Sequence, residues 1–186
     1  YTSVEDAKRI SVVGPTARAS AMNVDIRRDD PYAAYSELDW NVIVRDEGDA
    51  LARVVVRLLE IYESIRLIRQ ALKSLPSGPI LTDMGQLELP VSEACDRVEA
   101  PRGELFYFMK SNGTNIPERV KIRTPSYMNN AALTTMLIGN STADAPLVIA
   151  SIDPCYSCTD RVAIVDAKNG EITYVTMEEL SRKKAQ

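Results

Sequence analysis

The sequence contains no histidine and only three cysteines among its 186 residues. The absence of histidine excludes histidine-activated serine or cysteine nucleophiles, histidine-rich zinc or copper sites, and a histidine-ligated haem built from this chain alone. Any general acid or base must be a carboxylate, lysine, tyrosine, cysteine or water. Three unevenly spaced cysteines do not make a disulfide scaffold. The close pair Cys155 and Cys158 is more consistent with metal binding or redox chemistry in a reducing compartment.

Positive charge and long apolar runs are also scarce. The net charge is -4 and the pI is about 5.0, so we expect no nucleic-acid partner. No run approaches the roughly 18 apolar residues of a membrane span. The segment that begins at Tyr1 has neither a start methionine nor a signal-peptide pattern, and it is typical of the interior of a longer chain. The length and the ordinary composition predict one compact globular domain.

The strongest periodic element follows Gly48. Asp49 is a plausible N-cap, and apolar residues recur at steps of three and four, which predicts an amphipathic helix over residues 49–75 that Pro76 ends. Its arginines are expected on a solvated or partner-facing side. Burial of its large side chains, at roughly 1.5–3 kcal/mol each, makes this helix the expected core organiser. The side chains expected to be buried are Leu51, Val55, Leu58, Leu59, Tyr62, Ile65, Ile68 and Leu72.

Two hairpins are predicted around glycine-containing turns. Residues 105–109 and 119–123 flank an Asn-Gly pair, and residues 162–166 and 172–175 flank a second turn. The predicted fold class is therefore α+β, mainly helical with β-hairpins. The other expected features are a loop over 80–98 with Cys95 as a buried small hydrophobe, a short helix over 131–138, and a buried strand or extended run over 147–152.

The segment 153–161, Asp-Pro-Cys-Tyr-Ser-Cys-Thr-Asp-Arg, is the most informative stretch of the sequence. Two cysteines three residues apart can chelate one metal from a single turn, which Pro154 stiffens. By itself the pair leaves structural zinc, an iron–sulfur cluster, a redox disulfide and coincidence open. Only Cys95 remains as a further thiol, so the other ligands of a four-coordinate site must come from outside these residues.

Several segments, taken together and in order, resemble the C-terminal half of nickel–iron hydrogenase large subunits. Residues 153–161 resemble the family's C-terminal metal motif. Residues 99–104 (Glu-Ala-Pro-Arg-Gly-Glu) resemble its Glu-Ala-Pro-Arg-Gly segment, and residues 121–129 resemble its Pro-Ser/Thr loop. Residues 27–35 and the helix end at 64–70 are similar to the related 49 kDa subunit of complex I. Arg161 replaces a histidine that many soluble members carry, which points to the membrane-bound, energy-converting (group 4) branch.

The resemblance implies specific roles. Cys155 and Cys158 would be metal ligands, with Cys158 bridging nickel to an iron that carries carbon monoxide and cyanide. Arg102 would stand over the metals and donate to a cyanide nitrogen, and Asp153 would hold it by a charge-assisted pair. Ser126 would donate to a second cyanide. The implied cofactor-binding residues are Pro101, Thr124, Pro125 and Ser126.

The implied protein is a part of a larger enzyme. Residues 1–161 would be the C-terminal part of the catalytic subunit, and residues 162–186 an extension that forms a hairpin or a maturation tail. The family's first Cys-x-x-Cys is absent, so either this chain is a fragment or the other half of the site is elsewhere. The implied partner is the N-terminal half of the large subunit. The implied activity is proton reduction to H2 with ferredoxin electrons, coupled to ion translocation. The other implied partners are a small subunit with iron–sulfur clusters and membrane-arm subunits, at the cytoplasmic side of the cell membrane.

Two alternatives stay open. A complex-I-related oxidoreductase subunit on the same scaffold would act on sulfur compounds or quinone without a nickel–iron centre. The Cys155/Cys158 pair disfavours the quinone version, which lacks it, whereas the missing first pair leaves the sulfur version open. The second alternative is a zinc-stabilised interaction module without enzymatic activity.

Overall fold

The computed structural model describes residues 1–82, 85, 89–159, 162–165, 169–175 and 182. The chain divides into two compact units, Tyr1–Pro154 and Cys155–Gln186. The functional division into 1–161 and 162–186 stays a prediction. Arg161, which supports the energy-converting branch, lies outside the described residues.

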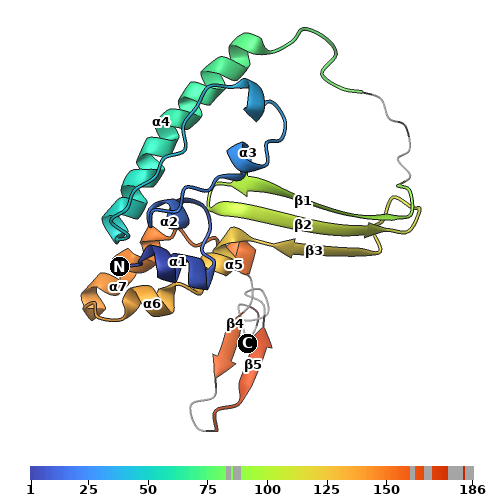
Figure 1. Cartoon of the computed structure of the whole chain (residues 1–186). Helices are drawn as coiled ribbons and strands as arrows, with labels where there is room; N and C mark the ends of the chain where they lie inside the picture. Colours follow the sequence, from blue (N-terminus) through green and yellow to red (C-terminus); the bar gives the residue numbers. More distant parts are fainter. Residues whose placement is uncertain (83–84, 86–88, 160–161, 166–168, 176–181, 183–186) are drawn as a thin grey trace. The chain divides into compact units, whose positions relative to one another are not determined.

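The long helix α4, Ala50–Ser74, is the main element of the first unit (Figure 1). The Asp49 carboxylate accepts a hydrogen bond of 2.7 Å from the Ala52 amide, which satisfies a free donor of the first turn. The helix ends at Ser74, just before Pro76. The predicted helix and its N-cap are therefore confirmed. No helix among the described residues combines the length and apolar character that crossing a bilayer requires.

The predicted burial of α4 is wrong. Its buried residues are Ala52, Arg53, Val56 and Leu67, and Val55 is half-buried. The helix packs on α2 and α7, and its small side chains Ala52 and Val56 meet Ala19 in a minor core. The described residues leave the larger apolar side chains exposed, from 39% for Leu59 to 71% for Tyr62. These exposed side chains, the apolar face of α4, are Leu51, Val54, Leu58, Leu59, Ile61, Tyr62, Ile65, Ile68 and Leu72.

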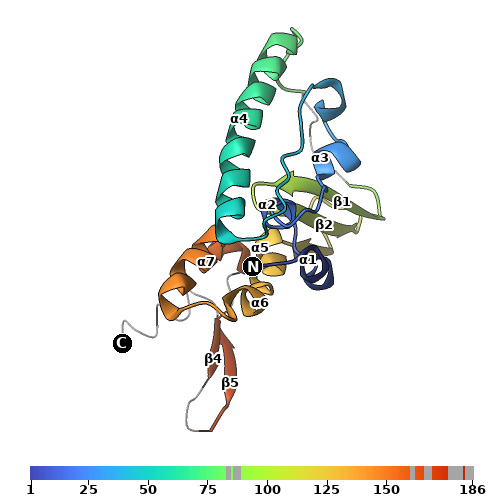
Figure 2. The same cartoon turned by 60° about the vertical axis from the view of Figure 1, so that its left-hand side comes forward.

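Short helices at the N-terminal end of α4 enclose the main core (Figure 2). They are α1 (Val4–Ile10), α2 (Gly14–Arg18), α5 (Pro125–Asn130), α6 (Leu133–Leu137) and α7 (Ala145–Ser151). The core residues are Ala7, Val12, Ala17, Ala132, Met136, Val148 and Ile152. The helix predicted over 131–138 is confirmed as α6.

The strand or extended run predicted over 147–152 is wrong, because these residues belong to α7. A short apolar run does not distinguish a buried strand from a buried helix. The local signal for a helix is the capping box of Ser141 and Asp144, which begins the 3-10 helix η2 (Thr142–Asp144) directly before α7. Pro146 in the first turn of α7 adds to that signal.

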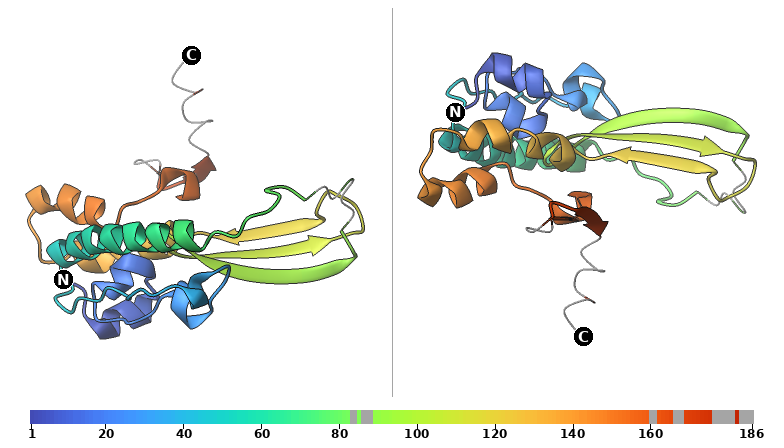
Figure 3. Two further views of the ribbon diagram at one scale, coloured as in Figure 1. Left: turned by 90° about the horizontal axis from the view of Figure 1, so that it is seen from above. Right: turned by 90° about the horizontal axis from the view of Figure 1, so that it is seen from below.

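A three-stranded antiparallel sheet is formed by β1 (Ser92–Ala100), β2 (Gly103–Ser111) and β3 (Arg119–Arg123). The predicted hairpin between β2 and β3 is confirmed. The loop predicted over 80–98 is wrong from Ser92 onward, because β1 pairs with β2 along its whole length. The helices and this sheet agree with the predicted α+β class. Figure 3 shows the sheet extending away from the short helices.

The two faces of the sheet differ in polarity. Directly opposed residues of antiparallel strands share a face, and the pairs Tyr107–Ile122 and Met109–Val120 lie on the same one. All four side chains are exposed. The opposite face carries Cys95, which is exposed, so its predicted burial is wrong. We call the first face, with Ala94, Val98, Leu105, Tyr107, Met109, Val120 and Ile122, the apolar face of the sheet.

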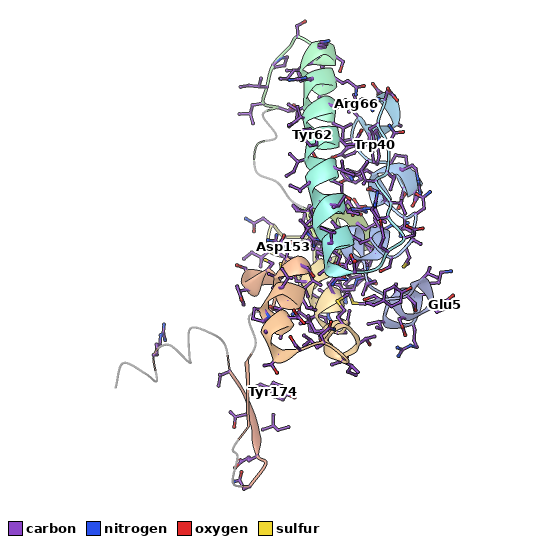
Figure 4. The ribbon with its side chains drawn as sticks, turned by 90° about the vertical axis from the view of Figure 1, so that its left-hand side faces the viewer. Glu5, Trp40, Tyr62, Arg66, Asp153 and Tyr174 are labelled. Carbon is purple, nitrogen blue, oxygen red and sulfur yellow. The ribbon has the colours of Figure 1, made fainter. Side chains whose placement is uncertain are left out.

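The remaining elements are short. In the first unit, α3 (Ile26–Asp29) ends before Pro31, and the 3-10 helix η1 (Tyr35–Glu37) precedes an extended segment over 38–47. That segment runs along α4, where Arg66 pairs with Asp39 (Figure 4). The second unit contains the 3-10 helix η3 (Tyr156–Thr159) and the antiparallel pair β4 (Val162–Val165) and β5 (Ile172–Val175). The strand pairing of the second predicted hairpin is thereby confirmed for residues 162–165 and 172–175, while Asp166 and Lys168 lie outside the described residues.

Arg18 joins four elements of the first unit through buried charges. Its Nε donates to Glu60 of α4 at 2.7 Å, and its Nη1 donates to Glu99 of β1 at 2.8 Å and lies 3.2 Å from the Asp25 carboxylate before α3. The side chain is 1% exposed. Burial disfavours the charged guanidinium, but the three carboxylates outweigh burial and raise the pKa of Arg18.

We expect Arg18→Met to lower the free energy of unfolding by about 3–5 kcal/mol, because it leaves buried carboxylates without their cation. The measurement is chemical unfolding followed by circular dichroism. Arg9→Met is the matched control: Arg9 pairs with Asp6 on the surface, so its loss should change stability by less than about 1 kcal/mol. Equal stability of the two variants would show that the Arg18 cluster does not hold the unit together.

Candidate functional site

The structure brings the predicted site residues Arg102 and Asp153 together. Arg102 lies in the turn between β1 and β2, and its Nε donates to the Asp153 carbonyl oxygen at 2.6 Å. Its Nη2 donates to Asp153 Oδ1 at 3.0 Å. Asp153 follows α7 with a φ of +54°, a conformation that aspartate tolerates better than most residues. The two contacts fix the plane of the guanidinium, which a single point contact does not do.

Asn129 fastens the turn that carries Arg102. This residue of α5 is fully buried, its Oδ1 accepts from the Val13 amide at 2.9 Å, and its Nδ2 donates to the Arg102 carbonyl at 3.0 Å. Gly14 and Gly103 allow the close approach, because a Cβ on Gly14 would lie 2.3 Å from the Cα of Gly103. Asn129 belongs to the 121–129 segment, but its own supporting role had no sequence signal beyond that.

The other predicted pocket residues of the first unit lie on the same supports. Thr124 is the N-cap residue of α5, and Pro125 and Ser126 are buried in its first turn, one turn before Asn129. Pro101 directly precedes Arg102 and lines a cavity of about 330 Å³ to which Asp153 also contributes. The structure thus places these residues on α5 and on the β1–β2 turn, which Asn129 connects.

The cavity beside Asp153 has walls of both charges. Arg18, Arg27 and Arg57 contribute the guanidinium groups, and Glu60 and Glu99 join Asp153 as carboxylates. Burial raises the pKa of Glu99, and Arg18 opposes that shift. Burial also lowers the pKa of Arg57. Buried, charged residues of this kind are typical of functional clefts as well as of structural ion networks.

Two arginines of α4 depart from the sequence prediction. Arg53 is 1% exposed and Arg57 is half-buried, although both were expected on a solvated or partner-facing side. Arginine is rarely fully buried, so no residue-level pattern indicated these positions.

Cys155 and Cys158, the predicted metal ligands, lie in the second unit. The Cys158 amide donates to the Cys155 carbonyl at 3.1 Å, and Thr159 Oγ1 donates to the same oxygen at 3.2 Å, within η3. Both cysteines are half-buried and neither is in a disulfide. The donor set is two soft sulfur atoms on one tight turn, which suits nickel, iron or zinc. Within the described ranges, no group of three or more Cys, Asp and Glu side chains could hold a metal alone.

Comparisons with known proteins place the chain among subunits of respiratory enzymes. Residues 1–161 match the family model described as "Respiratory-chain NADH dehydrogenase, 49 Kd subunit". The chain is 46% identical over 160 residues to the carbon monoxide-induced hydrogenase of Rhodospirillum rubrum, covering 86% of this chain and 44% of that protein. It is 37% identical to an NADH-quinone oxidoreductase protein of Chloroherpeton thalassium, covering 86% of this chain and 42% of that protein.

A solved structure is also similar. A chain of the membrane-bound sulfane sulfur reductase, described as an archaeal respiratory membrane complex, matches with a TM-score of 0.75 and 37% identity. The match covers 83% of this chain and 43% of that chain. The present chain therefore spans less than half the length of each of these relatives.

We expect Asn129→Ala to lower the free energy of unfolding by about 2–4 kcal/mol, because the Val13 amide and the Arg102 carbonyl lose a buried partner. Chemical unfolding measures the change. Asn130→Ala is the neighbouring control, since the buried Asn130 Oδ1 has no hydrogen-bond partner among the described residues. Its replacement should cost much less. A larger loss for Asn130→Ala than for Asn129→Ala would contradict the assignment of Asn129 as the support of the turn.

Proposed function

Since the chain belongs to the family of the 49 kDa subunit of respiratory-chain NADH dehydrogenase, we propose that it is part of the catalytic large subunit of a membrane-bound, energy-converting hydrogenase. The proposed reaction is the reduction of protons to H2 with electrons from ferredoxin. The reaction is coupled to ion translocation by membrane-arm subunits. The 46% identity to a hydrogenase supports this proposal.

The observation that carries the proposal is the order Arg102–Asp153–Pro154–Cys155. Asp153 holds the Arg102 guanidinium in a fixed plane. Asp153 is also the residue that directly precedes Pro154 and Cys155. The chain then provides two thiols on one turn. A cation with several donors would bind an anionic ligand of a metal, and two thiols on one turn would hold a soft metal.

The residues present fit a nickel–iron centre in part. Cys155 and Cys158 would hold it, and the remaining ligands would come from the N-terminal half of the subunit. When bound, this centre, with carbon monoxide and cyanide on its iron, supplies the two-electron chemistry between protons and H2. In this proposal Arg102 would supply a permanent positive charge and hydrogen-bond donors to the centre, and Asp153 keeps its guanidinium oriented. The proposed lining of the diatomic-ligand pocket is Pro101, Thr124, Pro125 and Ser126.

Two uncovered apolar surfaces support a multisubunit assembly. The apolar face of α4 and the apolar face of the sheet are both exposed in the described residues. Contiguous exposed apolar patches mark protein interfaces. We assign the N-terminal half of the same subunit to the face of α4, because the match covers less than half the length of each of these relatives. The other proposed partners are a small subunit with iron–sulfur clusters, ferredoxin and the membrane arm, at the cytoplasmic side of the membrane.

A second candidate function is the reduction of sulfur compounds on the same scaffold without a nickel–iron centre. The similarity to the sulfane sulfur reductase structure favours it, at 37% identity. In that case Cys155 and Cys158 would act as thiols or bind another metal. Elemental analysis of the intact complex decides between the candidates: about one nickel per complex supports the hydrogenase, and its absence supports the second candidate. Zinc without nickel or iron would favour the interaction module.

Cys158→Ser should remove nickel from the complex and lower H2 evolution by more than a hundredfold, because a hydroxyl is a poor ligand for a soft metal. The measurements are nickel content by mass spectrometry and H2 evolution with reduced ferredoxin. Cys95→Ser is the matched control, since this exposed cysteine lies on β1. It should retain nickel and activity. Full activity in Cys158→Ser would rule out the proposed ligand role.

A further inference from the structure

Three arginines bind three successive residues directly before the Pro154–Cys155 step. Arg53 Nε donates to Ser151 Oγ at 2.8 Å, and Arg57 Nη2 donates to the Ile152 carbonyl oxygen at 3.0 Å. Arg102 Nε donates to the Asp153 carbonyl oxygen at 2.6 Å. The first two arginines come from α4 and the third from the β1–β2 turn. Asp153 lies beside the first turns of α4 (Figure 4).

Arg53 and Arg57 lie next to each other on one side of α4 and act together. Residues four apart share a face of a helix, and Arg57 Nη1 also donates to the Arg53 carbonyl at 3.2 Å. Arg53 Nη1 donates to the Gly48 carbonyl at 3.3 Å. Both guanidiniums therefore reach across to residues 151–152 while remaining attached to the start of α4.

The partners of these two arginines are backbone carbonyls and a serine rather than carboxylates. Among the described residues neither arginine has an ion pair within 4.0 Å, in contrast to Arg18 with its three carboxylates. Burial and the neighbouring charge of Arg57 lower the pKa of Arg53 to about 10. Burying such cations without close carboxylates is costly for stability. Two residues that served stability alone could be apolar at these positions.

The contacted residues form the C-terminal end of α7 and the two residues after it. We call residues 151–153 the exit of α7. The carbonyls of Ile149 and Ala150 accept from the Ile152 and Asp153 amides, whereas the Ile152 carbonyl accepts from Arg57. A cation at a helix C-terminus is favourable. Ser151 Oγ also donates back to the Val148 carbonyl at 2.7 Å, so Arg53 binds a side chain that is already fixed. At the end of this exit, Asp153 adopts its left-handed conformation and the chain continues to Pro154. Arg53 and Arg57 thus contact the two residues at which the chain leaves α7.

We infer that Arg53 and Arg57 are positioning residues for Asp153. They act through residues 151–152, which they fix against α4, and so set the orientation of Asp153 toward Arg102. The catalytic consequence rests on the proposed function, whereas the fixing of residues 151–153 does not.

The first test measures amide hydrogen exchange in the intact complex. The Ile152 and Asp153 amides donate to the carbonyls of Ile149 and Ala150 at 3.3 and 3.0 Å. In Arg57→Met their exchange should rise about tenfold or more, because a charged hydrogen bond to this exit is lost. Arg57→Lys, which keeps the charge and one donor, should recover part of the protection. If complexes with Arg57→Met fail to assemble, Ser151→Ala provides a second test. This variant removes the hydroxyl that accepts the hydrogen bond from Arg53.

The matched control is Arg66→Met on the same helix, because Arg66 pairs with Glu63 and Asp39 at the surface. It should leave exchange at residues 152–153 unchanged. The second test compares infrared bands of carbon monoxide and cyanide in the nickel-containing complex: these should shift in Arg57→Met and stay constant in Arg66→Met. H2 turnover should fall about 10–100-fold in Arg57→Met, with nickel content retained.

The outcomes separate the inference from the proposed function. Unchanged exchange in both Arg57→Met and Ser151→Ala overturns the inference. Raised exchange with unshifted infrared bands and normal turnover overturns the positioning role and leaves these arginines structural. A third outcome is raised exchange in the variants and a wild-type complex that contains no nickel. This outcome supports the conclusion that the arginines fix residues 151–153, and it contradicts the hydrogenase proposal.

Discussion

The guanidinium of Arg18 contacts carboxylates from the segment before α3, from α4 and from β1. The hydrophobic core of the first unit consists largely of alanine, valine and a few larger side chains, and it is divided into two clusters. A core of this size leaves the long helix and the sheet weakly attached by apolar contacts alone. Charged hydrogen bonds between elements supply the missing attachment, and they also fix direction, since a guanidinium bonds in a plane.

The same principle explains where the candidate site lies. The β1–β2 turn approaches α2 through Gly14 and Gly103, and Asn129 fastens it. Arg102 is thereby presented from a rigid turn toward the exit of α7. Arg53 and Arg57 reach the same exit from α4. Elements that are distant in the sequence thus converge on three residues, 151–153. Such convergence from rigid elements is what a site with precise geometry requires.

Local signals in the sequence predicted elements, but not how the elements pack. Asp49 and the periodicity of α4 are local, and so is the Asn112-Gly113 turn of the hairpin, so both were correct. The buried side of α4 packs on Ala19, which directly follows α2, and on Ile43. The periodicity of α4 carries no information about these partners. β1 was missed because its polar residues alternate weakly and its turn, Pro101-Arg102, is not a common hairpin signal.

The candidate site shows the same division. The resemblance predicted Arg102 and Asp153 as partners, and they are in contact. It gave no indication of Arg53 or Arg57, because arginine side chains are usually exposed. Only the tertiary structure shows that α4 packs against α7. A scaffold shared by hydrogenase, quinone and sulfur enzymes does not by itself select a reaction. The arginines contact residues 151–153, while in the proposed function the two thiol sulfurs would determine which metal or substrate the chain binds. On that proposal the chemistry would depend on Cys155 and Cys158, and the orientation of Asp153 would depend on the arginines that contact residues 151–153.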